Sequence, residues 1–185
     1  MLNELYADAR DRMEKAVENL ERDFKRMRTG RASISLVDEI RVEYYGTSTP
    51  LNQLATLTIP EPRSIMIQPW DTTIISEVEK AILKSELGLT PMNDGKLIRI
   101  NIPPLTAERR RDMVKVIKKM AEETKVAARN IRRDVNEMIK ELKKEKEISE
   151  DEQFRAQEET QKITDDYIKK IDAVYSAKEK EILEI

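Results

Sequence analysis

The sequence predicts an α+β protein: an elongated antiparallel three-helix bundle with a small β/α/β domain inserted into it. Three observations support this. Two long stretches repeat apolar residues every three or four positions, without an interior glycine or proline. Residues 30–104, between them, change to the two-residue period of strands. Finally, 38% charged and only 4% aromatic residues suit long amphipathic helices with narrow cores.

The first helix is predicted to begin at Leu2 and to end at Gly30, because glycine commonly stops a helix. Its apolar stripe follows the alternating three- and four-residue spacing of a helix that packs in a bundle. The stripe comprises Leu2, Tyr6, Ala9, Met13, Ala16, Leu20, Phe24 and Met27.

Two further helices are predicted after residue 105. Thr106 is a plausible N-cap for the second, and Ser149 with Glu152 forms the capping-box pattern that opens the third. The second helix is expected to bury Met113, Ile117, Met120, Thr124, Ala127, Ile131, Val135, Met138 and Leu142, and its methionines are taken as core residues. The third is expected to bury Ile163, Tyr167, Ile171, Val174, Tyr175 and Ile182, with a mostly polar first half.

The central segment is expected to hold strands and one short helix. The strands are indicated by alternation at Ile40/Val42/Tyr44, Leu57/Ile59, Ile65/Ile67 and Ile98/Ile100/Ile102. A helix opened by Asp71 or Thr72 and closed at Gly88 would bury Ile75, Val78, Ile82 and Leu83. Asn93-Asp94-Gly95 is a tight-turn signal. Trp70 is interpreted as a core anchor of this domain, and the alternative is a ligand platform.

These elements divide the chain into a discontinuous bundle, residues 1–29 and 105–185, and an inserted domain, residues 30–104. The chain crosses between them twice, at residues 29–31 and 103–106. Two short linkers suggest a hinge, and a rigid packed junction is the alternative. The hinge candidates are Thr29, Gly30, Arg31, Pro103, Pro104 and Leu105.

The composition excludes several classes of site. The chain has no cysteine and no histidine, which rules out disulfides, thiolate nucleophiles, imidazole bases and zinc sites of the Cys/His type. Its four glycines form no phosphate-binding motif. We therefore expect no catalytic residue, no metal and no cofactor. No segment approaches membrane-spanning length or has the pattern of a targeting peptide, so a cytoplasmic protein is expected.

The charges are segregated along the chain although they nearly cancel, with 34 basic and 36 acidic residues. Residues 106–147 carry 14 basic and 9 acidic groups, whereas residues 148–185 carry 6 and 11. On a wheel of about 100° per residue, much of the excess falls on one face, predicted to point straight away from the core. This face comprises Arg111, Lys115, Lys118, Lys125, Arg129, Arg132 and Arg133, with Lys140 and Lys143 extending it.

Such a face has two interpretations. An ordinary solvated surface is one, and contact with nucleic-acid phosphates is the other. Arg129, Arg132 and Arg133 lie in the middle of the helix, where the helix dipole does not account for them. Arginine forks suit phosphate, and no aromatic residues are interleaved for stacking on single strands. The pattern therefore favours a nucleic-acid backbone recognised by its shape.

Eight short strings, in order along essentially the whole chain, resemble the bacterial ribosome recycling factors. Any one of them is weak evidence, and the set is strong. They are Arg28-Thr-Gly-Arg-Ala32, Val42-Glu-Tyr-Tyr-Gly46, Pro50-Leu-Asn-Gln-Leu-Ala55, Pro69-Trp-Asp71, Glu79-Lys-Ala-Ile82, Leu87-Gly-Leu-Thr-Pro91, Leu105-Thr-Ala-Glu-Arg109 and Ala128-Arg-Asn-Ile-Arg-Arg-Asp134.

The resemblance implies an L-shaped, two-domain, non-enzymatic factor. It would bind rRNA of the large subunit of the post-termination ribosome and, with elongation factor G and GTP held by that partner, separate the subunits. Arg129, Arg132 and Arg133 match the family's RNA-contacting motif, and Arg28 and Arg31 are further candidates.

One departure from the family pattern is Ser33-Ile34-Ser35, where relatives often carry a proline; it leaves the stiffness of the first crossing open. A monomer is expected. The alternative function is a helical adaptor that docks a protein through the bundle face.

Overall fold

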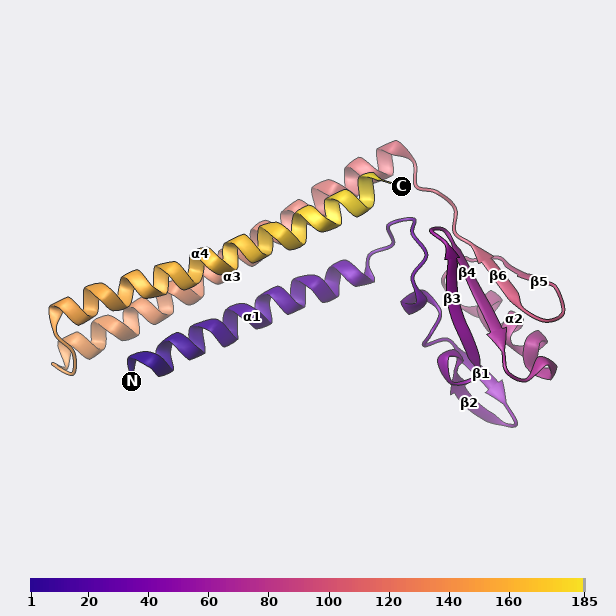
Figure 1. Ribbon diagram of the computed structural model, residues 1–185, viewed down its shortest axis with the longest axis horizontal. Coiled ribbons are helices and arrows are strands. Elements are labelled where there is room, and N and C mark those ends of the chain that lie inside the picture. Colours follow the sequence, from indigo (N-terminus) through magenta and orange to yellow (C-terminus); the bar gives the residue numbers. More distant parts are fainter. Residues whose placement is uncertain (185) are drawn as a thin grey trace. The chain divides into compact units, whose positions relative to one another are not determined.

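A computed structural model describes residues 1–184 (Figure 1). The chain divides into two compact units. Unit 1 comprises Met1–Arg28 and Ala107–Glu184, and unit 2 comprises Thr29–Thr106. Ile185, the last residue of the predicted bundle segment, lies outside the described residues.

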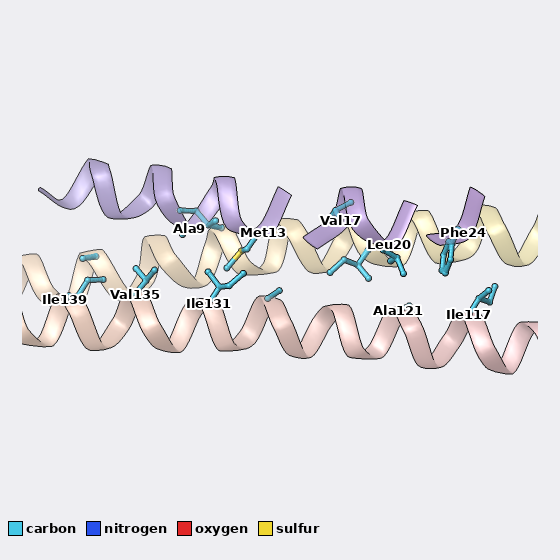
Figure 2. Close-up of a cluster of buried hydrophobic side chains, with 14 of the residues drawn as sticks. Ala9, Met13, Val17, Leu20, Phe24, Ile117, Ala121, Ile131, Val135 and Ile139 are labelled. Carbon is cyan, nitrogen blue, oxygen red and sulfur yellow. The ribbon is translucent and has the colours of Figure 1, made fainter. Parts of the chain in front are cut away.

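Unit 1 consists of three long helices that pack side by side: α1 (Leu2–Arg26), α3 (Ala107–Lys144) and α4 (Glu150–Leu183). α3 runs antiparallel to the other two (Figure 1). Figure 2 shows side chains of α1 and α3 meeting along one narrow core. Its labelled members are Ala9, Met13, Val17, Leu20 and Phe24 from α1 and Ile117, Ala121, Ile131, Val135 and Ile139 from α3.

The helix ends follow local capping chemistry. Ser149 accepts a hydrogen bond from the Glu152 amide at 3.2 Å, and the Glu152 carboxylate accepts one from the Ser149 amide at 2.7 Å, so the predicted capping box is confirmed. The prediction that Gly30 ends the first helix is wrong. α1 ends at Arg26, because Met27 already has an extended backbone, with φ −74° and ψ 133°.

The buried face of α3 is rotated from the predicted one. Ala121, Ala128 and Ile139 are buried, whereas Met138, predicted to face inward, is 45% exposed. The small side chains of the two alanines allow a neighbouring helix to approach closely. The basic residues on the α4 side of α3 are therefore nearer the helix interface than the sequence suggested.

In the first half of α4, small and polar residues share the buried face with Ile163. Ala156, Thr160 and Thr164 are all fully buried. The Thr160 hydroxyl donates to the Ala156 carbonyl and the Thr164 hydroxyl donates to the Thr160 carbonyl, both at 2.8 Å. Each hydroxyl thus finds its acceptor within its own helix, so these threonines enter the core without an unsatisfied polar group.

Unit 2 contains a hairpin and a four-stranded antiparallel sheet. The hairpin pairs β1 (Arg41–Tyr44) with β2 (Thr47–Pro50). The sheet has the order β3-β4-β6-β5, where β3 is Ala55–Glu61, β4 Ser64–Pro69, β5 Pro91–Asn93 and β6 Ile98–Asn101. The helix α2 spans Ile75–Lys84 after a 3-10 turn at Thr72–Ile74, and two further 3-10 turns span Ile34–Leu36 and Leu51–Gln53.

Unit 2 has an aliphatic core of its own, which includes Val42, Ile65, Ile67, Val78, Ile82, Ile98 and Ile100. Three predictions fail around it. Trp70 is 66% exposed and its indole nitrogen donates to the Thr56 hydroxyl at 2.9 Å, so it is not a core anchor. Leu83 is exposed, and α2 ends at Lys84 because Ser85, well before Gly88, is extended.

The predicted turn at Asn93-Asp94-Gly95 is confirmed. The Asn93 side chain accepts from the Gly95 amide at 2.7 Å. The Asp94 carboxylate accepts from the amides of Lys96 and Leu97, each at 2.9 Å. In the described part of the chain, no helix combines the length and apolarity needed to cross a bilayer.

Candidate nucleic-acid interface

Seven of the nine cations predicted on the basic face of α3 form two rows. We call Lys125, Arg132 and Lys143 the seam row, because each contacts α4. We call Arg111, Lys118, Arg129 and Arg133 the outer row. The two rows differ in how many hydrogen bonds and ion pairs they form within the protein.

Lys125 is the most enclosed member of the seam row, with a side chain only 15% exposed. Its ammonium group lies 2.5 Å from the Asp172 carboxylate of α4 and 3.2 Å from Glu122 on its own helix. The hydrogen bond to Asp172, followed by that to Glu122, raises the pKa of Lys125 above its ordinary value despite partial desolvation. Lys125 therefore joins two helices.

Arg132 also reaches α4. Its Nη1 donates to Oε1 of Gln161 at 2.8 Å, and Nε2 of that glutamine donates to Asp165 at 2.8 Å. Gln161 thus links Arg132 to the acidic residue Asp165 through two hydrogen bonds. Lys143 completes the row more loosely, 3.9 Å from Glu150.

The outer row is less engaged. Within residues 1–184, Lys118, Arg129 and Arg133 make no ion pair, and Arg111 donates only a long 3.4 Å bond to the Ala107 carbonyl. Lys118, Arg111 and Arg133 are exposed, and Arg129 is half-buried. Free guanidinium groups are suited to bidentate contacts with phosphate oxygens. Lys118, Arg129 and Arg133 can therefore bind phosphate without breaking an internal ion pair, and Arg111 would lose only its long bond to Ala107.

The prediction that the whole face points straight away from the core is wrong for Lys125 and Arg132. The buried side of α3 is centred between Ile131 and Ala128 on the wheel, which places these two cations on its α4 flank. Ala121 and Ala128 are the sequence signal that could have revealed this rotation. Both are buried although they lie outside the predicted stripe, and their small side chains allow close helix packing.

The remaining predicted residues lie near the two crossings. Arg28 is exposed at the end of its segment in unit 1. Arg31 belongs to unit 2 and is half-buried, with its Nε shielded from solvent and without a hydrogen-bond partner in residues 1–184. Thr29 is buried. The rRNA-binding role of all eight predicted cations stays a prediction.

Gly30 and the second crossing are close neighbours within unit 2. Gly30 has φ +81°, and a Cβ added there would meet Cγ of Leu105 at 3.2 Å. Pro103 and Pro104 are exposed and Leu105 is half-buried. Gly30 therefore combines a left-handed backbone with a close approach, which only glycine satisfies without strain.

Across residues 1–184 there is no group of three or more acidic side chains placed to hold a metal ion. The basic rows of α3 thus remain the strongest candidate site, and they are suited to binding.

Comparison with known proteins identifies the relatives of this chain. The family model described as ribosome recycling factor matches residues 20–183. The ribosome-recycling factor of Syntrophobacter fumaroxidans is 80% identical over all 185 residues, and that of Desulforapulum autotrophicum is 59% identical over the same length, each alignment covering 100% of both chains.

The chain belongs to the ribosome recycling factor family. A solution structure of a ribosome recycling factor matches it with a TM-score of 0.77 and 47% identity over 100% of this chain and 98% of the other. A second match, at TM-score 0.65 and 50% identity over 99% of each chain, is a model of the T. thermophilus factor with E. coli elongation factor G on the E. coli post-termination complex. The predicted family and the mixed helix-and-sheet fold class are confirmed.

Proposed function

We propose that this chain is a ribosome recycling factor in action as well as in family. It binds the large subunit of the post-termination ribosome and, together with elongation factor G, separates the subunits, releasing mRNA and tRNA. Full-length identity of up to 80% to proteins named for this activity supports the proposal, as does the related factor that shares its complex with elongation factor G. The chain works by binding in the cytoplasm, and GTP is held by elongation factor G.

The outer row is the observation that carries the RNA part of this proposal. Arg111, Lys118, Arg129 and Arg133 supply the primary phosphate contacts. The seam row adds Arg132, Lys125 and Lys143 only where RNA competes with α4 for them. Arg28 and Arg31 are assigned a secondary role beside the crossings.

Co-sedimentation with isolated large subunits over a range of salt concentrations tests the RNA contact. Each duplex phosphate neutralised should lower log K by about 0.9 per unit of log salt. Substitution of Arg129 and Arg133 by glutamine should weaken binding and reduce this slope. Unchanged affinity and slope in the variant, or salt-insensitive binding of the original protein, would favour the alternative of a protein adaptor docking through an apolar face.

The two crossings serve, in this proposal, as a hinge through which elongation factor G acts on the bound factor. Gly30 absorbs the backbone change, because glycine adopts positive and negative φ about equally, whereas an added Cβ here would be strained and would meet Leu105. Gly30→Ala should preserve large-subunit binding and slow subunit splitting in light scattering with elongation factor G and GTP.

Gly95→Ala is the matched control. It has φ +92° but no heavy atom within 4 Å of an added Cβ, so it carries the backbone strain without the contact to Leu105. Equal splitting rates in the two variants would refute a special role for Gly30. A loss of large-subunit binding in Gly30→Ala would show that the substitution impairs binding and not the hinge movement.

A further inference from the structure

A pocket of about 600 Å³ lies on unit 1 between the beginning of α1 and the last turns of α3, far along α3 from Arg111 and Lys118. We call it the tip pocket. Its floor and walls are mostly apolar. The lining residues are Met1, Glu4, Leu5, Asp134, Glu137, Met138, Glu141 and Leu142.

Two methionines in the tip pocket are not used by the core. Met1 is 59% exposed and Met138 is 45% exposed, and neither belongs to the apolar cluster of the bundle, whereas Leu5 packs against that cluster. Methionine is unbranched and polarisable, and it adapts to partners of varied shape. The pair thus offers an apolar surface that the fold itself leaves open.

The side chains around this surface are acidic. Four of the eight lining residues are carboxylates, and none of the eight is lysine or arginine. Glu4 lies 3.5 Å from the amino group of Met1, and Asp134 pairs with Arg12 at 2.6 Å. Glu137 and Glu141 pair with exposed lysines one turn further along α3, which are weak contacts that a partner can replace.

The acidic rim excludes one class of occupant and favours another. The four carboxylates of the lining disfavour a phosphate group inside the tip pocket, in contrast to the outer row. A positively charged protein segment has the complementary charge. An amphipathic helix satisfies both features, because its apolar face and its lysines or arginines lie on adjoining sides.

We propose that the tip pocket docks a basic amphipathic protein segment. Its apolar side chains lie between Met1 and Met138, and its cations pair with Glu4, Glu137 and Glu141. The proposal does not depend on the function proposed above, since it rests on the lining of this pocket alone.

Methyl NMR with 13C-labelled methionines tests it on the full chain. The probe is a synthetic helical peptide of leucines and lysines, with leucines at i, i+3, i+4 and i+7. The methyl signals of Met1 and Met138 should shift on titration. Met92, exposed but in unit 2, is the internal control and should stay in place. A peptide with glutamate for lysine, and one with serine for leucine, should leave all methionine signals unmoved.

Substitutions locate the binding. Met138→Lys should weaken the peptide about tenfold, whereas Val126→Lys, which adds the same charge at an exposed apolar position of α3 outside the pocket, should change affinity less than about twofold. Equal weakening by both variants, or a shift of Met92 equal to that of Met138, would show general charge attraction and overturn the proposal.

Two further outcomes would assign the pocket to another occupant and also overturn the proposal. One is concentration-dependent dimerisation in sedimentation velocity that Met138→Lys abolishes, which would make a second copy the occupant. The other is a shift of Met1 and Met138 with a short RNA duplex.

Discussion

Helices α3 and α4 lie side by side, yet they carry opposite charge and are held by different contacts. Residues 106–147 have an excess of five basic groups and residues 148–185 an excess of five acidic groups. α3 buries large aliphatic side chains such as Ile117 and Ile139, whereas the first half of α4 buries Ala156 and two threonines with one large aliphatic residue, Ile163. Where they meet, α4 neutralises the nearest cations of α3. The difference shows that cations already paired with a neighbouring helix must be set aside before the charge of a helix face is assigned to a binding partner.

The largest effect is expected from reversing the charge of the outer row. Arg129→Glu with Arg133→Glu should weaken large-subunit binding by about 3 kcal/mol or more, roughly hundredfold, because two charge-assisted contacts are replaced by repulsion. The thermal midpoint should change little, since neither arginine makes an ion pair within residues 1–184. Filter binding or co-sedimentation measures the first quantity and differential scanning calorimetry the second.

Lys119→Glu with Lys144→Glu is the control for this pair. Both lysines are exposed on α3, lie outside the predicted basic face, and are 3.9 and 3.8 Å from their acidic partners. If that variant weakens binding as much as the arginine variant, overall charge and not the outer row governs affinity. A large fall in the midpoint of the arginine variant would make these arginines structural.

A second prediction concerns the seam row. Lys125→Ala should lower the free energy of unfolding by about 1–2 kcal/mol, because it removes the contact to Asp172 and leaves that carboxylate without its cation. Lys118→Ala, one heptad earlier and exposed, should change it by less than about 0.5 kcal/mol. Urea unfolding followed by circular dichroism distinguishes them. Equal losses would remove the distinction between the rows.

What the sequence could predict depends on how far apart the interacting residues are. The capping box of Ser149 and Glu152 and the turn at Asn93-Asp94-Gly95 involve neighbours along the chain, so the pattern is visible in the letters. Periodicity likewise identified the three long helices, because each has an apolar stripe of its own.

Contacts through space could not be predicted in this way. Asp172 is the partner of Lys125, and only the register of α3 against α4 brings the two together. From its sequence, Trp70 is expected in the core. In the structure its indole donates to Thr56, on the neighbouring strand β3, and stays at the surface. The tip pocket also depends on register, since it pairs the first turn of α1 with the last turns of α3.

A third prediction tests the local support of α4. Ser149→Ala should cost about 1 kcal/mol of unfolding free energy, because it leaves the Glu152 amide without its side-chain acceptor. Since residues 150–160 bury only Ala156 and Thr160, hydrogen exchange should increase there more than in the second half of the helix. Ser85→Ala, at the end of α2, is a control that should leave exchange in α4 unchanged. Uniform protection along α4 would show that α3 alone holds its first half.

The smallest effect is expected on the α1 side of α4, where Lys170 donates to Glu14 at 2.7 Å. This hydrogen bond, with one from Tyr167, lowers the pKa of Glu14 below its ordinary value. A lowered pKa in the folded state means that the carboxylate stabilises the fold above the ordinary pKa, and that this contribution is lost as the pH falls through the folded value. Because both side chains are partly exposed, the contribution should be a few tenths of a kcal/mol. Glu14→Gln removes the titration, so its stability deficit at neutral pH should shrink toward zero in acid. A deficit for Glu14→Gln that stays constant between neutral and acidic pH would show that the pair acts through packing and not through charge.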